Sequence, residues 1–217
     1  MKNNKALILS YGLILYAIWS VTELIVVPYM ELRSLSGQTI DITKEILLKS
    51  LIWFLPAMLI LMRCDESMHI KKSELFSCKQ GFIKAIPIFI LFTAYHLINT
   101  YVLNGRISFD SSFHLSDILI ALSVGLSEEI VFRGLFLNYT LKEDRKWIPI
   151  LVNAGLFLMI HFPSWLRQGI FMPQLEGGAF VLIMILSFIF SWTFIKSKSI
   201  VIPIILHAYW DLLCFIL

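Results

Sequence analysis

The sequence predicts an all-α protein, a polytopic bundle of about seven transmembrane helices that forms a single domain over residues 1–217. Two observations carry this prediction. Hydrophobic residues make up 58% of the chain and charged residues 15%, whereas soluble domains have roughly 45–50% apolar and about 25% charged residues. The apolar residues are also grouped into runs long enough to cross about 30 Å of hydrocarbon. This pattern disfavours a soluble enzyme, a disordered tail and a disulfide-stapled secreted module.

Seven apolar segments are expected to cross the membrane. They lie at about 6–30, 46–62, 82–103, 117–140, 147–162, 178–195 and 200–217. The first segment follows a basic start but is too long for the h-region of a signal peptide, so it is expected to remain as a permanent helix. The stretch from Pro163 to Gly178 is too irregular for a span. We expect it to form a plain outer loop, with a gate beside the fifth segment as the alternative.

The basic residues between the segments predict the orientation. Of the 18 lysines and arginines, eleven fall in the inner segments and five in the outer ones if the N-terminus is inside; Lys84 and Arg133 lie within spans. The outer five include Lys44 and Lys49. Because cytoplasmic loops carry an excess of Lys and Arg, the N-terminus of this cell-membrane protein is expected to be cytoplasmic. The net charge of +3 is too small and scattered to indicate a nucleic-acid partner, so the lipid bilayer is the expected environment.

Six ionisable side chains stand out within the predicted spans. They are Glu128, Glu129 and Arg133 in the fourth segment, His161 in the fifth, and His207 and Asp211 in the seventh. A charge at the bilayer centre costs about 2.5–3.5 kcal/mol on insertion scales, so each is a functional candidate. At about 1.5 Å of rise per residue, the two glutamates, the two histidines and Asp211 fall in one mid-membrane band. The sequence therefore predicts a buried polar site that three helices share.

The spacing within the fourth and seventh segments predicts how these side chains are arranged. Glu129 and Arg133 are separated by four residues, which places them within reach of an ion pair on one helix face. Adjacent residues on a helix point about 100° apart, so Glu128 is expected to face a cavity between helices. His207 and Asp211 repeat the four-residue spacing. The alternative is an ion-pair network that only locks the helices together, and the pattern leaves open whether Glu128 or Glu129 is a base.

The chemistry open to these groups is hydrolysis of an amide or ester inside the membrane. A buried glutamate can take a proton from water, a histidine beside it can orient that water or protonate a leaving amine, and a second histidine can donate to an oxyanion. Alternatively, Glu128, His161 and His207 are candidate ligands for a divalent metal such as Zn²⁺, whose bound water would be the nucleophile. The sequence has no HExxH motif and no Ser or Cys at an obvious spacing from these histidines, which disfavours covalent catalysis.

Three short motifs occur in order in the second half of the chain: EEIVFRG at residues 128–134, FLMIH at 157–161 and HAYWD at 207–211. They resemble the EExxxR, FxxxH and HxxxN or HxxxD motifs of the CPBP family. That family, also called Abi, comprises the type II CAAX prenyl endopeptidases and their bacterial relatives. The resemblance covers a motif core at about 117–217, and the first half of the chain shares only its hydrophobicity.

The resemblance implies an intramembrane endopeptidase that uses a glutamate-activated water to cleave a hydrophobic, membrane-associated or lipidated peptide. By motif position it implies a set of roles: Glu128 as the base with His161 as its partner, His207 and Asp211 as the oxyanion-stabilising pair, and Glu129 and Arg133 as supports. Many members have Asn in place of Asp211. Because a carboxyl group donates a hydrogen bond only when protonated, Asp211 is also a candidate to orient His207.

The metal question and the biological role stay open at this level. The family's older name is metalloprotease, and a metal-free glutamate mechanism is an equal alternative. The short chain looks more like the bacterial branch, which is associated with bacteriocin immunity and peptide maturation. Two other functions are alternatives: a non-catalytic membrane immunity or binding scaffold, and a proton-coupled transporter. The sequence contains no inverted repeat, which disfavours the transporter.

Overall fold

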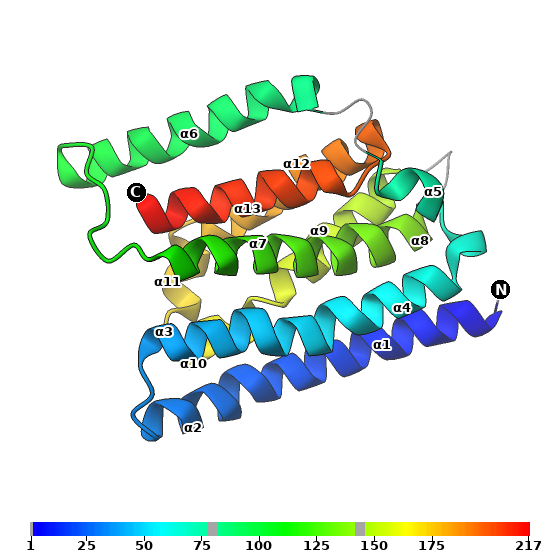
Figure 1. Ribbon diagram of the computed structural model, residues 1–217, viewed down its shortest axis with the longest axis horizontal. Helices are drawn as coiled ribbons and strands as arrows, with labels where there is room; N and C mark the ends of the chain where they lie inside the picture. The colour runs from blue at the N-terminus through cyan, green and yellow to red at the C-terminus, as the bar shows by residue number, and fades with distance from the viewer. Residues whose placement is uncertain (1, 78–81, 142–145) are drawn as a thin grey trace.

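The structure, a computed structural model, describes residues 2–77, 82–141 and 146–217, and these residues form helices without any strand. Seven long helical rods run alternately in opposite directions along the long axis of the molecule (Figure 1). The N-terminus and the C-terminus lie at opposite ends of the bundle (Figure 1). The predicted all-α transmembrane class is therefore confirmed.

The first two rods are each interrupted by π-helical segments. The first consists of α1 (Lys2–Val21), the π-helix η1 (Thr22–Val26) and α2 (Val27–Leu32). The second consists of α3 (Gly37–Asp41), the π-helices η2 (Ile42–Leu48) and η3 (Ser50–Phe54), and α4 (Leu55–Arg63). A π-helical turn is rare in proteins and is found mostly at functional sites.

The second rod begins at Gly37, well before the predicted start at residue 46. Lys44 and Lys49 therefore lie within a helix, and their assignment to an outer loop was wrong. Both side chains are buried, at 8% and 4% exposure. Charged residues fit inside this rod because each lysine is paired with a carboxylate of the bundle.

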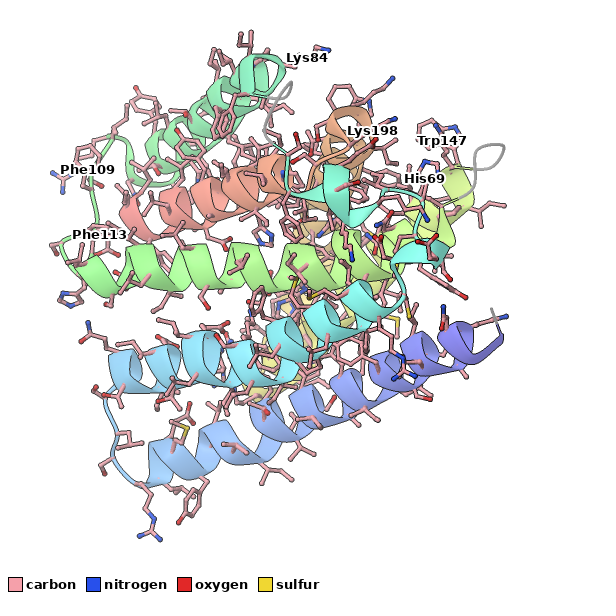
Figure 2. All side chains as sticks on the ribbon, turned by 45° about the vertical axis from the view of Figure 1, so that its right-hand side comes forward. His69, Lys84, Phe109, Phe113, Trp147 and Lys198 are labelled. Atoms are coloured by element: carbon pink, nitrogen blue, oxygen red, sulfur yellow. The ribbon has the colours of Figure 1, made fainter. Side chains whose placement is uncertain are left out.

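A short connection leads to the third rod at the edge of the bundle. The connection contains a 3₁₀ turn, η4 (Asp65–Ser67), and α5 (Lys72–Leu75). The third rod is α6 (Phe82–Asn104), which packs against the C-terminal helix (Figure 1). Figure 2 shows Lys84, Lys198 and Trp147 at one end of the bundle and Phe109 and Phe113 at the other.

The fourth rod lies near the centre of the bundle. It consists of α7 (Leu115–Glu129), the π-helix η5 (Ile130–Leu137) and α8 (Asn138–Thr140). Every residue of η5 is buried, although its sequence includes Arg133. A helix that is buried all round is typical of the centre of a large bundle.

The last three rods complete the bundle. They are α9 (Trp147–Met159) extended by α10 (Phe162–Arg167), then α12 (Ala179–Ser197), and finally α13 (Val201–Ile216). Residues 163–178 were expected to form a plain loop, but α10 and α11 (Phe171–Glu176) make most of this stretch helical. Pro163 is compatible with α10 because it lies in the first turn, where a missing N–H costs nothing.

Five of the rods are long and apolar enough to cross a membrane by themselves. The fourth rod carries four ionisable residues, and α13 is only 16 residues long. These two rods lie inside the bundle, where neighbouring helices cover them. The predicted count of about seven spans thus corresponds to seven helices, of which five have the length and composition of independent spans.

Close packing of α7 against α13 positions the third motif relative to the first. A Cβ atom added at Gly125 would lie 2.9 Å from the backbone nitrogen of Ala208 and 3.0 Å from the carbonyl oxygen of Ile204. Such distances are below normal van der Waals separation, so the contact requires glycine. Small residues at helix interfaces in membranes let backbones approach in this way. His207 is consequently brought beside Glu128 and Glu129.

Candidate active site

Glu129, Arg133 and His207 form a buried cluster between α7, η5 and α13. Glu129 Oε1 accepts a hydrogen bond from Arg133 Nη1 at 2.8 Å and lies 2.8 Å from His207 Nδ1. Glu129 and Arg133 have 0% exposure. The ion pair predicted from their spacing is therefore confirmed. Because a carboxylate only accepts, Nδ1 of His207 carries the proton and donates to Glu129.

The guanidinium of Arg133 joins this cluster to the sixth rod. Its Nη2 donates to Ser187 Oγ at 2.8 Å and to the Ser187 carbonyl oxygen at 3.3 Å. The guanidinium also lies over the rings of Phe157 and Phe190, at 4.4 and 5.3 Å from their centroids. These contacts give both terminal nitrogens of the buried guanidinium a partner, and Nε alone has none among the described residues. An unpaired charge in such an interior would be very costly.

Glu128 points away from this cluster, as expected for the neighbouring residue on a helix. Its Oε1 accepts a hydrogen bond from Lys49 Nζ at 2.6 Å. The same ammonium lies 2.6 Å from Glu45 Oε2. Glu128 Oε2 lies 3.9 Å from His207 Nε2. Lys49, on the second rod, therefore bridges two carboxylates, one of which comes from the first motif.

The ionic chain continues along the second rod to the first and fifth. Lys44 Nζ lies 2.9 Å from Glu45 Oε1 and 3.1 Å from Glu23 Oε1. Glu23 Oε2 in turn accepts a hydrogen bond from Arg167 Nε at 3.0 Å. Positive and negative side chains thus alternate from Arg167 in α10 to Glu128 in α7. Buried ion pairs persist where each charge has partners of this kind.

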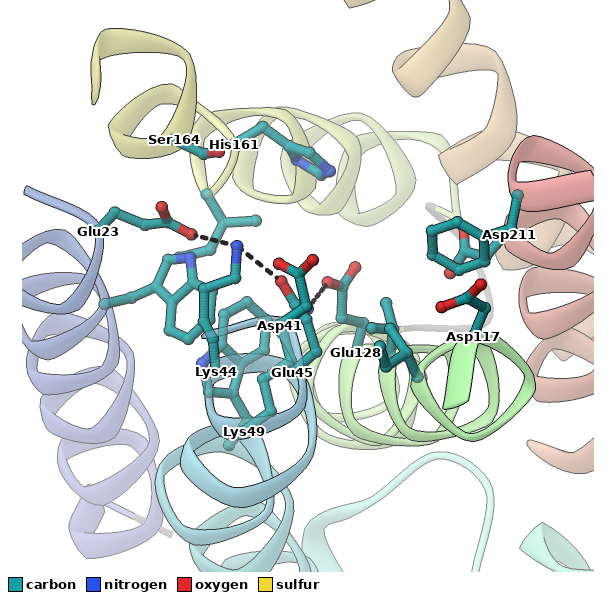
Figure 3. A pocket seen from close by; sticks show the side chains of 16 residues that line it. Glu23, Asp41, Lys44, Glu45, Lys49, Asp117, Glu128, His161, Ser164 and Asp211 are labelled. Carbon is teal, nitrogen blue, oxygen red and sulfur yellow. Dashed lines mark hydrogen bonds and ion pairs between the residues drawn. The ribbon is translucent and has the colours of Figure 1, made fainter. Parts of the chain in front are cut away.

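A cavity of about 310 Å³ opens between these rods, and its walls contain parts of all three motif-bearing helices. Figure 3 shows Glu128, His161 and Asp211 around this space, with Lys49 and Glu45 on the adjoining wall. Further charged residues line it: Glu23, Asp41, Lys44 and Asp117. The cavity therefore joins a carboxylate and an imidazole in a polar space inside an apolar bundle. That is the kind of space in which a protein can hold water away from the lipid.

His161 contributes one nitrogen to the cavity. Its Nδ1 lies 2.8 Å from the carbonyl oxygen of Phe157. A carbonyl oxygen only accepts, so Nδ1 carries the proton and Nε2 of the neutral ring is an acceptor. Its imidazole and the carboxylate of Glu128 point into the same space in Figure 3. An imidazole fixed in this tautomer can accept a hydrogen bond from water.

His207 and Asp211 are within reach of each other but not at hydrogen-bond distance. His207 Nε2 lies 3.6 Å from Asp211 Oδ2, and its ring stacks on Phe190 with the centroids 4.9 Å apart. Since Nδ1 is occupied by Glu129, Nε2 is the nitrogen that faces Glu128 and Asp211. The structure thus brings all six predicted site residues into two adjoining groups, one around Glu129 and one at the cavity.

These residues do not fit a metal ion in this arrangement. Among the described residues, no three His, Cys, Asp or Glu side chains are placed to hold one. The candidate ligand set Glu128, His161 and His207 is interrupted because the Lys49 ammonium lies 2.6 Å from Glu128 Oε1. The Lys49 ammonium therefore occupies Glu128 Oε1, and a metal ion bound there would have to lie next to a positive charge. The chemistry derived below uses protein groups alone.

The comparison with protein families now has a structural context. Residues 110–213 match the family described as type II CAAX prenyl endopeptidase, Rce1-like. This segment, slightly less than half of the chain, is similar to that family. No curated protein and no solved structure matches the chain. The Rce1-like family indicates a CAAX protease-like intramembrane endopeptidase, in agreement with the motif resemblance.

The Rce1-like match includes the three motifs but not the whole site. Lys49 contacts Glu128, and Glu45 contacts Lys49. Both residues lie outside residues 110–213. Neither residue was predicted, because Lys49 was counted with the outer cations and the second segment was expected to begin after Glu45. Their four-residue spacing within an otherwise apolar stretch is the signal that could have revealed them, since it matches the spacing of the ion pair in the first motif.

Proposed function

We propose that this protein is an intramembrane endopeptidase that hydrolyses a peptide bond with a water molecule activated by Glu128. The observation that carries the proposal is the shared cavity. Glu128, His161 and Asp211 line it together, and His207 lies at its edge within 4 Å of two of them. The family match over residues 110–213 supports peptide hydrolysis as the reaction.

Glu128 is the better candidate for the base than Glu129. Glu129 has 0% exposure and does not line the cavity: its Oε1 binds Arg133 and His207, and its Oε2, although without a hydrogen-bond partner, is buried. Glu128 lines the cavity, and its Oε2 has no hydrogen-bond partner closer than the 3.9 Å contact with His207 among the described side chains. A general base must have an oxygen free to reach the proton that it removes. In this proposal Glu129 and Arg133 are supports that fix His207.

The proposed first step is attack of water on the scissile carbonyl carbon. Glu128 takes one proton from the water, and the oxygen forms the new bond to carbon while His161 Nε2 orients the second proton. The carbonyl electrons move to oxygen and form an oxyanion. His207 Nε2–H donates to that oxyanion, which requires an imidazolium because Nδ1–H is already directed at Glu129.

The proposed second step is collapse of the tetrahedral intermediate. The oxyanion electrons return to the carbonyl, the C–N bond breaks, and the proton held by Glu128 passes to the leaving amine. The products are a carboxylic acid and an amine, and Glu128 is an anion again. Asp211 lies beside His207 Nε2, so in this scheme its carboxylate orients the imidazolium rather than donating to the oxyanion.

The proposed substrate is a hydrophobic, membrane-associated or lipidated peptide. The rods that surround the cavity have apolar outer surfaces, which suits a substrate that is itself held in the membrane. Bacteriocin immunity and peptide maturation are two roles that such an activity would serve. The cleavage assay below distinguishes both from a scaffold that binds without chemistry.

The test compares purified wild type with Glu128→Gln on lipidated and transmembrane-tail peptides, with products identified by mass spectrometry. Loss of the base is expected to reduce cleavage by at least about 100-fold. Glu66→Gln is the matched control, because the Glu66 side chain is 98% exposed and does not line the cavity. Thermal unfolding in detergent checks that both variants fold.

Each outcome of this assay has a definite reading. Cleavage by wild type and Glu66→Gln but not by Glu128→Gln supports the proposal. Equal cleavage by Glu128→Gln contradicts Glu128 as the base. Absence of cleavage by every variant over the whole peptide set favours the scaffold alternative.

A further inference from the structure

The ammonium of Lys49 belongs to the site but lies outside the motifs and outside the family match. It lies 2.6 Å from Glu128 Oε1, although Lys49 is 79 residues away in the sequence and on a different rod. Lys49 is buried, with 4% exposure. Placing an ammonium in this interior is costly unless its partners compensate for the lost hydration. Its position therefore calls for a physical account.

Lys49 is held in place from several sides. Its Nζ lies 2.6 Å from Glu45 Oε2, and it lies over the rings of Trp19 and Trp53, at 5.4 and 5.1 Å from their centroids. Cation–π contacts of this kind fix the direction of an ammonium in an apolar environment. Glu45 itself is anchored by Lys44 at 2.9 Å. The ammonium is therefore a fixed charge rather than a mobile side chain that happens to meet Glu128.

The contact has a specific consequence for Glu128. Lys49 occupies Oε1, so the second oxygen, Oε2, is the one left toward His207 Nε2. A carboxylate with one oxygen bound to a fixed cation stays ionised and cannot rotate freely. A base needs both properties, because it must be anionic and must face the water that it deprotonates.

We propose that Lys49 is a positioning residue of the active site, which keeps Glu128 ionised and turns Glu128 Oε2 toward the reacting water. This inference rests on the proposed function of Glu128. It extends the catalytic centre into the second rod, outside the segment that matches the family. Lys49 acts through Glu128 and does not itself bond to the substrate.

A purely structural ion pair is the competing explanation. Lys49 could serve only to hold the second rod against α7. In that case its loss would reduce folding stability, and the enzyme that remains folded would turn over normally. Lys44→Met provides the matched control, because Lys44 is on the same rod, is also buried, and pairs with Glu45 and Glu23 but not with Glu128.

The kinetic test uses Lys49→Met, Lys49→Ala and Lys44→Met on a peptide that the wild type cleaves. Lys49→Met is expected to lower kcat by at least about 100-fold with KM changed by less than about threefold, because binding is retained and the base is misplaced. Lys44→Met is expected to keep a kcat at least about tenfold higher than that of Lys49→Met. Propylammonium restores the atoms removed in Lys49→Ala, so it is expected to recover turnover in that variant and not in Glu128→Gln.

A second measurement does not depend on any substrate. Infrared difference spectra between wild type and Glu128→Gln isolate the carboxylate band of Glu128. In the wild type we expect the band of an ionised carboxylate. In Lys49→Met this band should be replaced by the band of a protonated carboxyl group, whereas in Lys44→Met it should persist. A buried carboxylate that loses its cation takes up a proton rather than remain unpaired.

The outcomes separate the two proposals. Normal kcat in folded Lys49→Met, or an unchanged Glu128 band, would overturn the positioning role while leaving Glu128 as the base. Full activity of Glu128→Gln would overturn the proposed function itself. Loss of the ionised band in Lys49→Met together with rescue by propylammonium supports both.

Discussion

Arg133 illustrates how single residues keep a charge stable inside this bundle. Its guanidinium has 0% exposure and meets a carboxylate, a serine and two aromatic rings. The neighbouring Glu129 also binds His207. Arg133 thus orients Glu129, and Glu129 in turn determines which nitrogen of His207 faces Glu128 and Asp211.

Removal of Arg133 is expected to reduce stability strongly. In Arg133→Met the Glu129 carboxylate stays buried without its cation, and breaking a buried pair from one side costs about 3–5 kcal/mol. Unfolding in detergent followed by tryptophan fluorescence measures this change. Peptide cleavage is expected to fall as well, since Glu129 no longer fixes His207.

The double variant Glu129→Gln with Arg133→Met provides the control for this prediction. It removes both charges, so its loss of stability should be smaller than the sum of the single losses by about 0.5–3 kcal/mol. Additive losses would contradict a direct interaction between the two residues and would assign the cost of Arg133→Met to its aromatic and serine contacts.

At the scale of helices, close packing and π-helical turns place the site residues. Glu23 lies in η1, Lys44 and Glu45 lie in η2, and Arg133 lies in η5. A π-helical turn adds a residue to the helix and changes which side chains face inward. Three charged residues of the ionic chain and one of the buried cluster thus lie in segments that depart from regular α-helix geometry.

The contact between α7 and α13 gives the prediction at this scale. In Gly125→Ala the added Cβ would lie 2.9 Å from Ala208 N, so the two helices must move apart. We expect a loss of about 1–3 kcal/mol in stability. We also expect reduced cleavage, because His207 is next to Ala208 and would shift away from Glu129. Thermal unfolding and the peptide assay measure the two effects.

Gly155→Ala is the matched control on α9. A Cβ at Gly155 meets nothing within 4 Å, and alanine is the better helix former by about 1 kcal/mol. This variant should be as stable as wild type or more so, with unchanged cleavage. If Gly125→Ala behaved in the same way, the close approach of α7 and α13 would not be what positions His207.

Local spacing accounts for the parts of the site that could be predicted from the sequence. The Glu129–Arg133 ion pair and the direction of Glu128 away from that pair, into the cavity, follow from helix geometry alone. Lys49 could not be placed in this way, because its partner Glu128 lies on another rod and a charged stretch normally ends a span. The helical character of residues 163–178 was also missed, since their composition resembles a loop.

At the scale of the whole molecule, the two halves of the chain have different roles in one bundle. The second half carries the family motifs, whereas the first two rods supply the wall that contains Lys49 and Glu45. The alternation of seven rods puts the two termini at opposite ends (Figure 1). Lys44 and Lys49 lie inside the second rod, so the outer count of five loses two members, and the excess of lysines and arginines stays at the end that holds the N-terminus.

This asymmetry predicts the orientation of the protein in the membrane. The end of the bundle that holds the N-terminus carries an excess of lysines and arginines and is expected to be cytoplasmic. Residues on the connection after the second rod should then be inside, and residues on the connection after the third rod should be outside. Ser73 and Ser112 are exposed residues on these two connections.

Labelling of single cysteines with a membrane-impermeant maleimide tests this orientation. In a variant without Cys64, Cys78 and Cys214, Ser112→Cys should react in intact cells, and Ser73→Cys should react only after lysis. The reverse pattern would show that the N-terminus is outside. Reaction of both positions in intact cells would contradict an odd number of crossings between them and would require α6 to lie along the membrane surface rather than across it.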